Sequence, residues 1–196
     1  MFLASDKLKK LNAVSSINEF NIQGASIDLS IGEQAKVLKT DKPINLFELK
    51  ENENLLSDRF EQIDLAKGYE LKPLSYLYAS SAEKVKIPKN MCGLIMPRST
   101  FARLGLILPI SSYANPGYEG HLPIIIFNAS GVGITIPPYI RIMQLIFCEL
   151  NGEAIAYHSN KGAKYQNEIP LQTPILNDKD LENIFKNIEL YNEKHK

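Results

Sequence analysis

The feature of this sequence that most constrains its fold is a series of short apolar runs in the second half of the chain, each ended by a turn signal. The runs cover residues 92–96, 104–110, 122–127, 134–136 and 140–150. Pro97, Asn115-Pro-Gly, Asn128-Ala-Ser-Gly and Pro137-Pro138 separate them, and these residue types favour turns. Many short strands at such spacing predict an all-β barrel or sandwich and exclude βαβ units.

The remaining elements are fewer. We expect a strand at residues 25–31 and strands on both sides of Pro73, at residues 69–72 and 76–79. Apolar residues at helical spacing predict a short helix at residues 5–11 and another at residues 180–192. The polar residues 38–62 predict a long loop. We therefore expect a mainly β domain over residues 1–176 and a helical tail over residues 177–196.

Size and charge narrow the class of protein. The chain has 196 residues, 44% of them hydrophobic, which suits one globular domain with a buried core. It carries 22 Lys and Arg against 22 Asp and Glu, and this neutral balance argues against a nucleic-acid partner. The charge is unevenly distributed, because the few charged residues of the apolar stretch 85–150 are mostly basic. They are Lys86, Lys89, Arg98, Arg103 and Arg141 against Glu119 and Glu149.

Cysteine use and hydropathy indicate the compartment. Cys92 and Cys148 are far apart in the sequence and outside any CxxC motif, which argues against a disulfide scaffold and against a cysteine zinc site. The first residues lack the apolar stretch of a signal peptide, and no apolar run reaches membrane-spanning length. We therefore expect a cytoplasmic protein with no membrane partner.

Several nucleotide and metal sites are excluded by absent motifs. The chain has no GxxxxGK[ST] loop, and Gly131-Val-Gly133 lacks the third glycine of a dinucleotide fingerprint. These two glycines instead predict a hairpin turn. His121, His158 and His195 have no zinc-type spacing to each other or to cysteine. We expect no metal held by protein side chains.

The stretch Pro97-Arg-Ser-Thr-Phe-Ala-Arg-Leu-Gly-Leu106 carries the most chemical information. Arg98 and Arg103 flank the hydroxyl residues Ser99 and Thr100. Guanidinium groups and hydroxyls are good donors to phosphate oxygens, so the stretch is a candidate anion site. From these residues alone, the alternative is that Arg98 and Arg103 are ordinary surface charges that bind no ligand.

Taken with other segments, this stretch resembles the dCTP deaminase and dUTPase superfamily. The superfamily has, in order, an RSS-x-A-R-x-G-L motif, a D-P-G-W/Y-x-G turn, a strand ending in Asn, and an R-x-x-Q-L strand. Here the matching segments are PRSTFARLGL, NPGYEG at residues 115–120, Phe127-Asn128, and RIMQL from Arg141.

Two further segments resemble the deaminase branch. GASIDLSIG at residues 24–32 is similar to its early S-x-D-L-R-L-G strand. Tyr157 and the following GAKYQ at residues 162–166 are similar to its C-terminal A-K-Y segment. The glycine-rich C-terminal phosphate motif of dUTPases is missing. The resemblance covers roughly residues 24–168 and implies a distorted, jelly-roll-like β-barrel.

The resemblance also implies the ligand and the assembly. The ligand would be a deoxynucleoside triphosphate (dCTP, dUTP or dTTP), with Mg²⁺ carried by the triphosphate. The assembly would be a homotrimer with active sites at subunit interfaces. The residues implied in nucleotide binding are Arg98, Ser99, Thr100, Arg103, Asn115, Tyr118, Gln144, Tyr157, Lys164 and Tyr165.

The departures from the superfamily pattern concern catalysis. The glutamate that acts as general base in the deaminases lies three positions before the strand's Asn, and that position is Ile125 here. The turn aspartate of dUTPases is Asn115. Loss of a general base costs about 10²–10⁴-fold in rate. Glu119, in the turn, and Glu168, which replaces the usual Gln of the closing segment, are the acids that could substitute.

Three hypotheses about function therefore stay open. The first is a dCTP deaminase-like hydrolase that converts dCTP to dUTP. The second is a catalytically inactive homologue that binds nucleotide in a regulatory role. The third is a dUTP diphosphatase. Nucleotide binding is favoured in all three by the retained Arg98, Ser99, Arg103 and Gln144.

Overall fold

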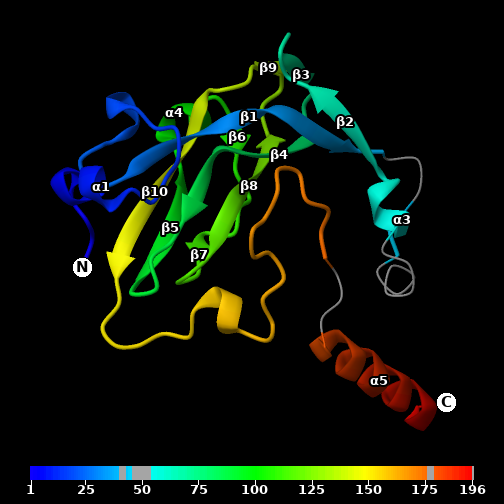
Figure 1. Cartoon of the computed structure of the whole chain (residues 1–196). Coiled ribbons are helices and arrows are strands. Elements are labelled where there is room, and N and C mark those ends of the chain that lie inside the picture. The colour runs from blue at the N-terminus through cyan, green and yellow to red at the C-terminus, as the bar shows by residue number, and fades with distance from the viewer. Residues whose placement is uncertain (40–42, 46–53, 176–178, 196) are drawn as a thin grey trace.

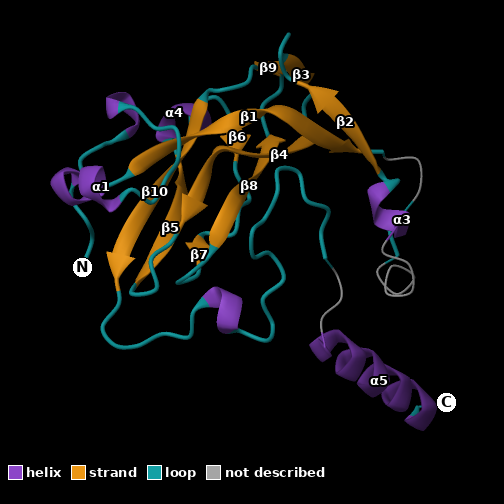
Figure 2. Cartoon of the chain, in the orientation of Figure 1, coloured by secondary structure: helices purple, strands orange, loops and turns teal. Residues whose placement is uncertain are grey.

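The computed structural model describes residues 1–39, 43–45, 54–175 and 179–195, and strands dominate it (Figures 1 and 2). The helices are short except for the last. They are α1 (Ser5–Leu11), α3 (Asn54–Ser57), α4 (Ser99–Ala102), α5 (Lys179–Lys194) and the 3₁₀ helices η1 (Glu19–Asn21) and η2 (Tyr157–Ser159). The strands are β1 (Ile27–Leu38), β2 (Phe60–Asp64), β3 (Tyr69–Leu71), β4 (Tyr76–Lys86), β5 (Met91–Pro97), β6 (Leu106–Ile107), β7 (Tyr113–Ala114), β8 (Glu119–Asn128), β9 (Ile134–Ile136) and β10 (Arg141–Glu149).

The strands form one large curled sheet and one small one. The large sheet has 8 strands in the order β6-β8-β4-β1-β10-β5-β7, with β2 paired to β1 at the side, and β3 pairs with β9 in the small sheet. The long strand β1 joins two halves, because its first residues pair with β10 and its later residues pair with β4 and β2. Register shifts after Leu29 and after Ile31 accompany this change of partner. Such bulges increase local twist, and the sheet curls around its core.

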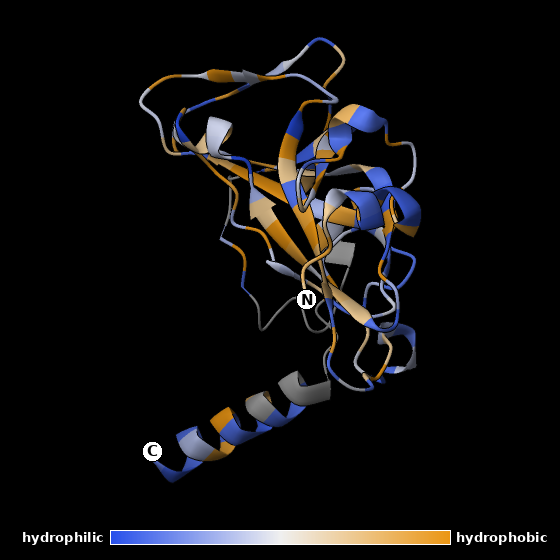
Figure 3. Ribbon diagram, turned by 90° about the vertical axis from the view of Figure 1, so that its left-hand side faces the viewer, coloured by the Kyte–Doolittle hydropathy of each residue, from blue (hydrophilic) through white to orange (hydrophobic). Residues whose placement is uncertain are grey.

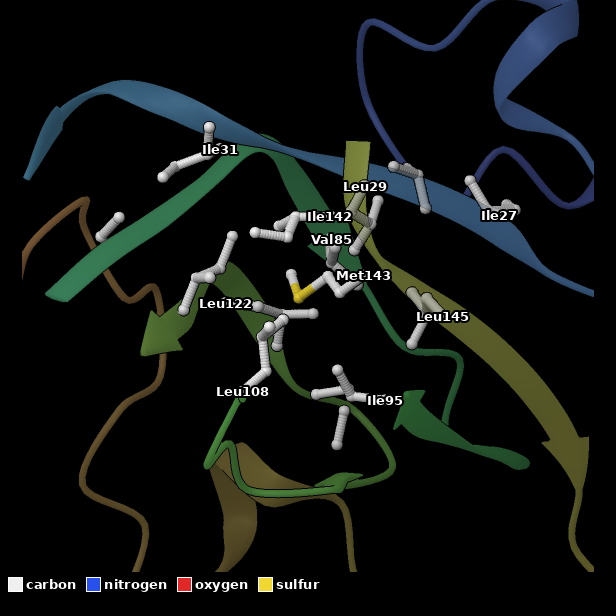
Figure 4. Close-up of a cluster of buried hydrophobic side chains, with 14 of the residues drawn as sticks. Ile27, Leu29, Ile31, Val85, Ile95, Leu108, Leu122, Ile142, Met143 and Leu145 are labelled. Atoms are coloured by element: carbon white, nitrogen blue, oxygen red, sulfur yellow. The ribbon is translucent and has the colours of Figure 1, made fainter. Parts of the chain in front are cut away.

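The core lies on the concave side of this sheet. Figure 4 shows apolar side chains of β1, β8 and β10 meeting there, among them Leu29, Leu122 and Ile142. Along β8 buried and half-buried residues alternate, as a strand with one face on the core requires. Leu122, Ile124 and Ile126 face the core, whereas Pro123 and Ile125 face the other side. That other side of β8 carries the cavity described below.

Most of the predicted elements are confirmed. The apolar runs 92–96, 122–127, 134–136 and 140–150 correspond to β5, β8, β9 and β10, and the helices at residues 5–11 and 180–192 correspond to α1 and α5. The run 104–110 forms only the short β6, because Gly105 adopts a left-handed turn with φ 83° before it. The turn at Pro73 is present, with Leu74 at φ 56° between β3 and β4.

The loop predicted for residues 38–62 is only partly correct, because residues 39, 43–45 and 58–59 are loop or turn but residues 38, 54–57 and 60–62 belong to a strand or helix. The strand predicted at residues 25–31 continues to Leu38, and β2 then pairs with it from Phe60 opposite Leu38 to Asp64 opposite Gln34. The short α3 precedes β2. The sequence of β2 gives no strand pattern, because its apolar residues Phe60 and Ile63 are three apart and the polar residues between them are exposed. Residues 40–42 and 46–53 lie outside the described part of the chain.

The hairpin predicted at Gly131 and Gly133 is also wrong. β9, which follows these glycines, pairs with β3 and not with β8. The side-chain amide of Asn128 stabilises the turn by donating to the carbonyl oxygens of Leu71 and Val132, each at 2.8 Å. These bonds from a buried side chain hold the turn next to β3, and β9 pairs with β3 instead of with β8, the strand that precedes it.

The two cysteines, distant in the sequence, are neighbours in the sheet. Cys92 on β5 lies directly opposite Cys148 on β10, and both are free thiols. Their separation in the sequence gave no indication of this pairing.

The C-terminal helix α5 lies apart from the sheet in two perpendicular views (Figures 1 and 3). It exposes the apolar side chains of Ile188, Leu190 and Tyr191. Among the helices of the described residues, none has the length and apolar character needed to cross a bilayer.

Candidate functional site

A cavity of about 450 Å³ lies beside β4 and β8, over the face that carries Tyr78 and Ile125 and next to the edge of the core at Leu122. Its volume is in the range of pockets that enclose small ligands. Its walls come from β4, β8, the β5 and β7 region, and the C-terminal segment, by which we mean residues 156–175. The lining residues are Phe60, Tyr76, Tyr78, Ile95, Ser111, Tyr113, Ala114, Asn115, Tyr118, Leu122, Pro123, Ile125, Tyr157, Tyr165, Glu168, Gln172 and Pro174.

The floor of the cavity is aromatic because of strand alternation. Tyr76 and Tyr78 are two residues apart on β4 and therefore share a face. Tyr78 lies opposite Ile125 of β8 and packs edge-on against Phe60, with ring centroids 6.4 Å apart. None of these three aromatic residues is among the site residues predicted from the sequence. The spacing of Tyr76 and Tyr78 on a predicted strand is the signal that could have found two of them.

The C-terminal segment forms the outer wall and is bonded to the barrel. The Tyr78 hydroxyl donates to the carbonyl oxygen of Gln172 at 2.6 Å. The backbone N–H of Leu171 donates to Ser80 Oγ at 2.8 Å. The Tyr157 hydroxyl accepts from the N–H groups of Lys164 and Tyr165, at 3.2 and 3.0 Å. The segment that resembles the closing segment of the deaminases therefore already lies against the cavity of its own chain.

Tyr118 and Glu168 meet in the wall of the cavity. The Tyr118 hydroxyl donates to Glu168 Oε2 at 2.8 Å. The backbone of Glu168 bridges to Gly120, and the N–H of His121 donates to its carbonyl oxygen at 2.9 Å. A Cβ at Gly120 would lie 2.7 Å from the Glu168 nitrogen, so this close approach requires glycine.

Burial changes the proton affinity of this acid. The Glu168 side chain is enclosed, with 7% of the residue exposed. Removal from water raises the pKa of Glu168 to about 7, and the hydrogen bond from Tyr118 opposes that rise. The nearby carboxyl and burial together raise the pKa of Tyr118 as well. Near neutral pH the acid therefore exchanges a proton easily while the phenol stays neutral.

The two positions that depart from the superfamily pattern also line the cavity. Ile125 supplies an apolar side chain and Asn115 a carboxamide. Of the lining residues, Glu168 alone carries a carboxyl group.

Glu119, the other acid considered from the sequence, lies outside the cavity lining. Its carboxylate pairs with Lys84 at 2.6 Å and with Lys86 at 3.5 Å. The hydrogen bond from Lys84 lowers the pKa of Glu119 below its ordinary value. It is a poor proton acceptor, because it is a surface carboxylate satisfied by two ammonium groups.

A second group of predicted residues gathers around Asp28, which is fully buried. Asp28 Oδ2 lies 3.3 Å from Arg98 Nε and 3.5 Å from Arg141 Nη1. This oxygen atom accepts no hydrogen bond from the described residues, so the two ion pairs are its polar contacts. Gln144 Nε2 donates to Asp28 Oδ1 at 3.3 Å. Arg98 also donates to the carbonyl oxygen of Arg141 at 2.7 Å. We call Asp28, Arg98, Arg141 and Gln144 the Asp28 cluster.

Of the remaining residues predicted to bind nucleotide, Ser99, Thr100 and Arg103 are exposed and Lys164 is half-buried. Ser99 and Thr100 lie on α4, and Arg103 follows it, with no ion pair to any described residue. Lys164 donates to the carbonyl oxygen of Ile175 at 3.2 Å. Arg98, Ser99, Thr100, Arg103, Gln144 and Lys164 are all outside the cavity lining. Within one chain, the predicted residues therefore fall into an aromatic group in the cavity and a basic, polar group elsewhere.

Among the described residues, no group of three His, Cys, Asp or Glu side chains is arranged to hold a metal ion.

Comparison with known proteins identifies the family. The family model described as dCTP deaminase-like matches residues 3–150. The "dCTP deaminase, dUMP-forming" of Nanoarchaeum equitans is 30% identical over 173 residues, which cover 82% of this chain and 87% of the relative. The dCTP deaminase of Haemophilus influenzae is 32% identical over 160 residues, covering 77% and 82% of the two chains.

A solved structure shows the same fold. The 2'-deoxycytidine 5'-triphosphate deaminase of Agrobacterium tumefaciens superposes with a TM-score of 0.61 at 20% identity, covering 74% of this chain and 47% of that longer chain. The predicted mainly β, dUTPase-like barrel is confirmed, and it defines the class. The chain belongs to the dCTP deaminase-like family of the dCTP deaminase and dUTPase superfamily.

Proposed function

We propose that this protein binds a deoxynucleoside triphosphate with the base in the aromatic cavity. The observation that carries the proposal is that Asn115, Tyr118, Tyr157 and Tyr165, which match nucleotide-contacting positions of the family, line one cavity of about 450 Å³. Aromatic walls suit a planar base, because stacking on an aromatic ring stabilises it.

We propose further that the protein is a homotrimer whose sites lie between subunits. The separation of the cavity from Ser99, Thr100 and Arg103 supports this, because a neighbouring copy could bring those donors to the triphosphate. Magnesium would arrive as part of the nucleotide, bound to its phosphates. Light scattering measures the oligomeric state. A monomer in the presence of nucleotide would refute the proposal that the sites lie between subunits.

The reaction we propose is hydrolytic deamination of dCTP to dUTP, the activity named for the Haemophilus relative. A catalytically inactive, nucleotide-binding homologue is the alternative, supported by Ile125 in the cavity. Release of pyrophosphate is a third candidate, because the name of the Nanoarchaeum relative includes dUMP formation. Asn115 weakens it, since a carboxamide cannot accept the proton of an attacking water.

We assign the protein to the cytoplasm. The support is that Cys92 and Cys148 face each other as free thiols, a state that a reducing compartment maintains.

Binding and turnover are tested separately. Calorimetry with dCTP, dUTP and dTTP plus magnesium should give heat with at least one nucleotide, and the absence of heat and of a thermal shift with all three would refute nucleotide binding. Ammonia release from dCTP and pyrophosphate release from dCTP and from dUTP then separate the three candidates. If the wild type releases neither while Ile125→Glu gains deamination, the inactive homologue is the correct alternative.

A further inference from the structure

The carboxyl group of Glu168 is the least expected group in the cavity. A buried carboxyl group is costly to ionise, and among aromatic and apolar neighbours an amide would satisfy the same space without charge. The family pattern has Gln at this position. The chain has thus lost an acid at Ile125 and gained one at Glu168, and both positions line the same cavity.

The carboxyl group is held in a fixed place with one oxygen available. Oε2 accepts from Tyr118, and the Glu168 backbone is bonded to Gly120 and His121. Oε1 makes no hydrogen bond to any described residue and is not among the fully enclosed side-chain atoms. A ligand or water in the cavity can therefore reach Oε1 while Tyr118 holds the other oxygen.

Glu168 also lies close to Tyr78, the aromatic residue of the cavity floor that is paired with Ile125. Tyr78 is the cross-strand partner of Ile125 and interacts electrostatically with Glu168. Tyr78 also bonds to Gln172 in the C-terminal segment. Glu168 therefore shares the cavity with the cross-strand pair Tyr78 and Ile125, in the region that an acid at position 125 would serve.

We propose that Glu168 is the general acid–base residue of this cavity and replaces the carboxylate missing at Ile125, with Tyr118 as its positioning residue. The proposal rests on the proposed function, since it requires a cytosine base in the cavity.

The reaction balances with water alone. The Glu168 carboxylate removes a proton from water, and the hydroxide oxygen bonds to C4 of the ring. The electron pair of the N3=C4 double bond moves to N3, which takes this first proton from Glu168. Glu168 then removes the second water proton from the hydroxyl on C4 and gives it to the amino nitrogen, the bond between C4 and that nitrogen breaks, and ammonia leaves as C4 becomes a carbonyl. One water and one dCTP give one dUTP and one ammonia, with no change in oxidation state. A group that exchanges its proton near neutral pH suits both transfers.

The pH dependence follows from the groups packed on Glu168. These are the phenols of Tyr118 and Tyr78, and both have a raised pKa, because burial and the nearby carboxyl disfavour their ionised forms. They stay neutral while Glu168 titrates. Since the carboxylate is the active form, kcat/KM for dCTP should rise with pH to a plateau above about 7.

The experiment uses the full-length protein with dCTP and magnesium. Glu168→Gln should lower kcat at least about 100-fold, the usual effect of losing a general base. It should keep the affinity for dUTP within about threefold, because the amide preserves shape and leaves product binding intact. Tyr118→Phe should retain turnover and move the rising limb of the pH profile to higher pH. The exposed carboxylate Glu149→Gln is the matched control and should change neither.

The outcomes separate this inference from the proposed function. No nucleotide binding by the wild type refutes both. Wild-type binding without turnover, or turnover that survives in Glu168→Gln, overturns the role of Glu168 and leaves nucleotide binding in place. Retained dUTP binding by Glu168→Gln excludes misfolding as the cause of lost turnover.

Discussion

Tyr118 and Glu168 are joined by a hydrogen bond of 2.8 Å that connects the start of β8 to the C-terminal segment. The phenol donates and the carboxylate accepts, so the bond favours the ionised acid and opposes the effect of burial on its pKa.

Removing this donor should make Glu168 a weaker acid. In Tyr118→Phe, burial acts without opposition, so the pKa of Glu168 should rise above its wild-type value of about 7. Carbon-detected NMR titration of the glutamate carboxyl groups measures the shift. Tyr139→Phe, which removes the phenol bonded to Glu33, is the matched control and should leave Glu168 unchanged. A Glu168 titration that does not move in Tyr118→Phe would contradict the assignment.

Glu168 should also make stability depend on pH. Its pKa is raised from 4.5 to about 7 on folding, so the native state binds the proton more tightly. The free energy of unfolding should therefore fall as pH rises between about 4.5 and 7, by up to about 3 kcal/mol. Urea unfolding at pH 5 and pH 8 measures the fall.

Glu168→Gln cannot titrate, and its unfolding free energy should lose that part of the pH dependence. Glu149→Gln should keep the wild-type difference between the two pH values, because its carboxyl is exposed. Equal slopes for the wild type and Glu168→Gln would show that the acid is not buried as described.

The Asp28 cluster should be important for stability. Asp28→Asn removes a buried negative charge and leaves Arg98 and Arg141 unpaired. Breaking a buried pair costs about 3–5 kcal/mol, but the two arginine side chains are 28% and 35% exposed and regain water, so we expect a loss of about 2 kcal/mol. Chemical denaturation gives the value. The exposed Asp64→Asn should change stability by less than about 0.5 kcal/mol, and an equally small effect at Asp28 would show that the cluster contributes little.

Arg103 should bind the triphosphate. Arg103→Ala should weaken dCTP binding by at least about 1.5 kcal/mol, roughly tenfold, the contribution of a charge-assisted hydrogen bond. Calorimetry with dCTP and with deoxycytidine separates the phosphate from the base, because only the triphosphate should respond. Lys89→Ala removes another exposed positive charge and serves as the control. Equal affinities of the wild type and Arg103→Ala for dCTP would remove Arg103 from the site.

The tail should be dispensable for folding. A chain ending at residue 176 lacks α5, whose described side chains are mostly exposed. Its free energy of unfolding should stay within about 0.5 kcal/mol of the full chain. A chain ending at residue 155 also lacks the C-terminal segment and should lose nucleotide binding. A large loss of stability in the chain ending at residue 176 would show that residues 1–176 are not an independent domain.

The apolar strands and the helix α1 were predictable, because their apolar residues mark the face that is buried. The helix α5 was predictable from the helical spacing of its apolar residues, although its described side chains are mostly exposed. The pairing of β2 with β1 was not predictable, since the sequence of β2 gives no strand pattern. The partner of β9 depends on Asn128, whose hydrogen bonds reach residues far apart in sequence.

The candidate site was predictable in its parts and not in its arrangement. The motifs named Tyr118 and Glu168 separately, but only the folded chain brings the phenol and the acid together. Asp28 lies in the early motif at residues 24–32, whereas its partners Arg98 and Arg141 come from segments about 70 and 113 residues later in the sequence. Long-range charge pairing leaves no local pattern in a sequence.

The Asp28 cluster also limits how strongly the protein can attract a polyanion. Two arginines around one buried carboxylate amount to a single net positive charge, and Arg98 already points its Nε at Asp28. The carboxylate of Asp28 therefore halves the positive charge that these two arginines present to an approaching triphosphate. Association should then depend on close, directional bonds from the exposed donors rather than on long-range attraction, and added salt should slow it only slightly.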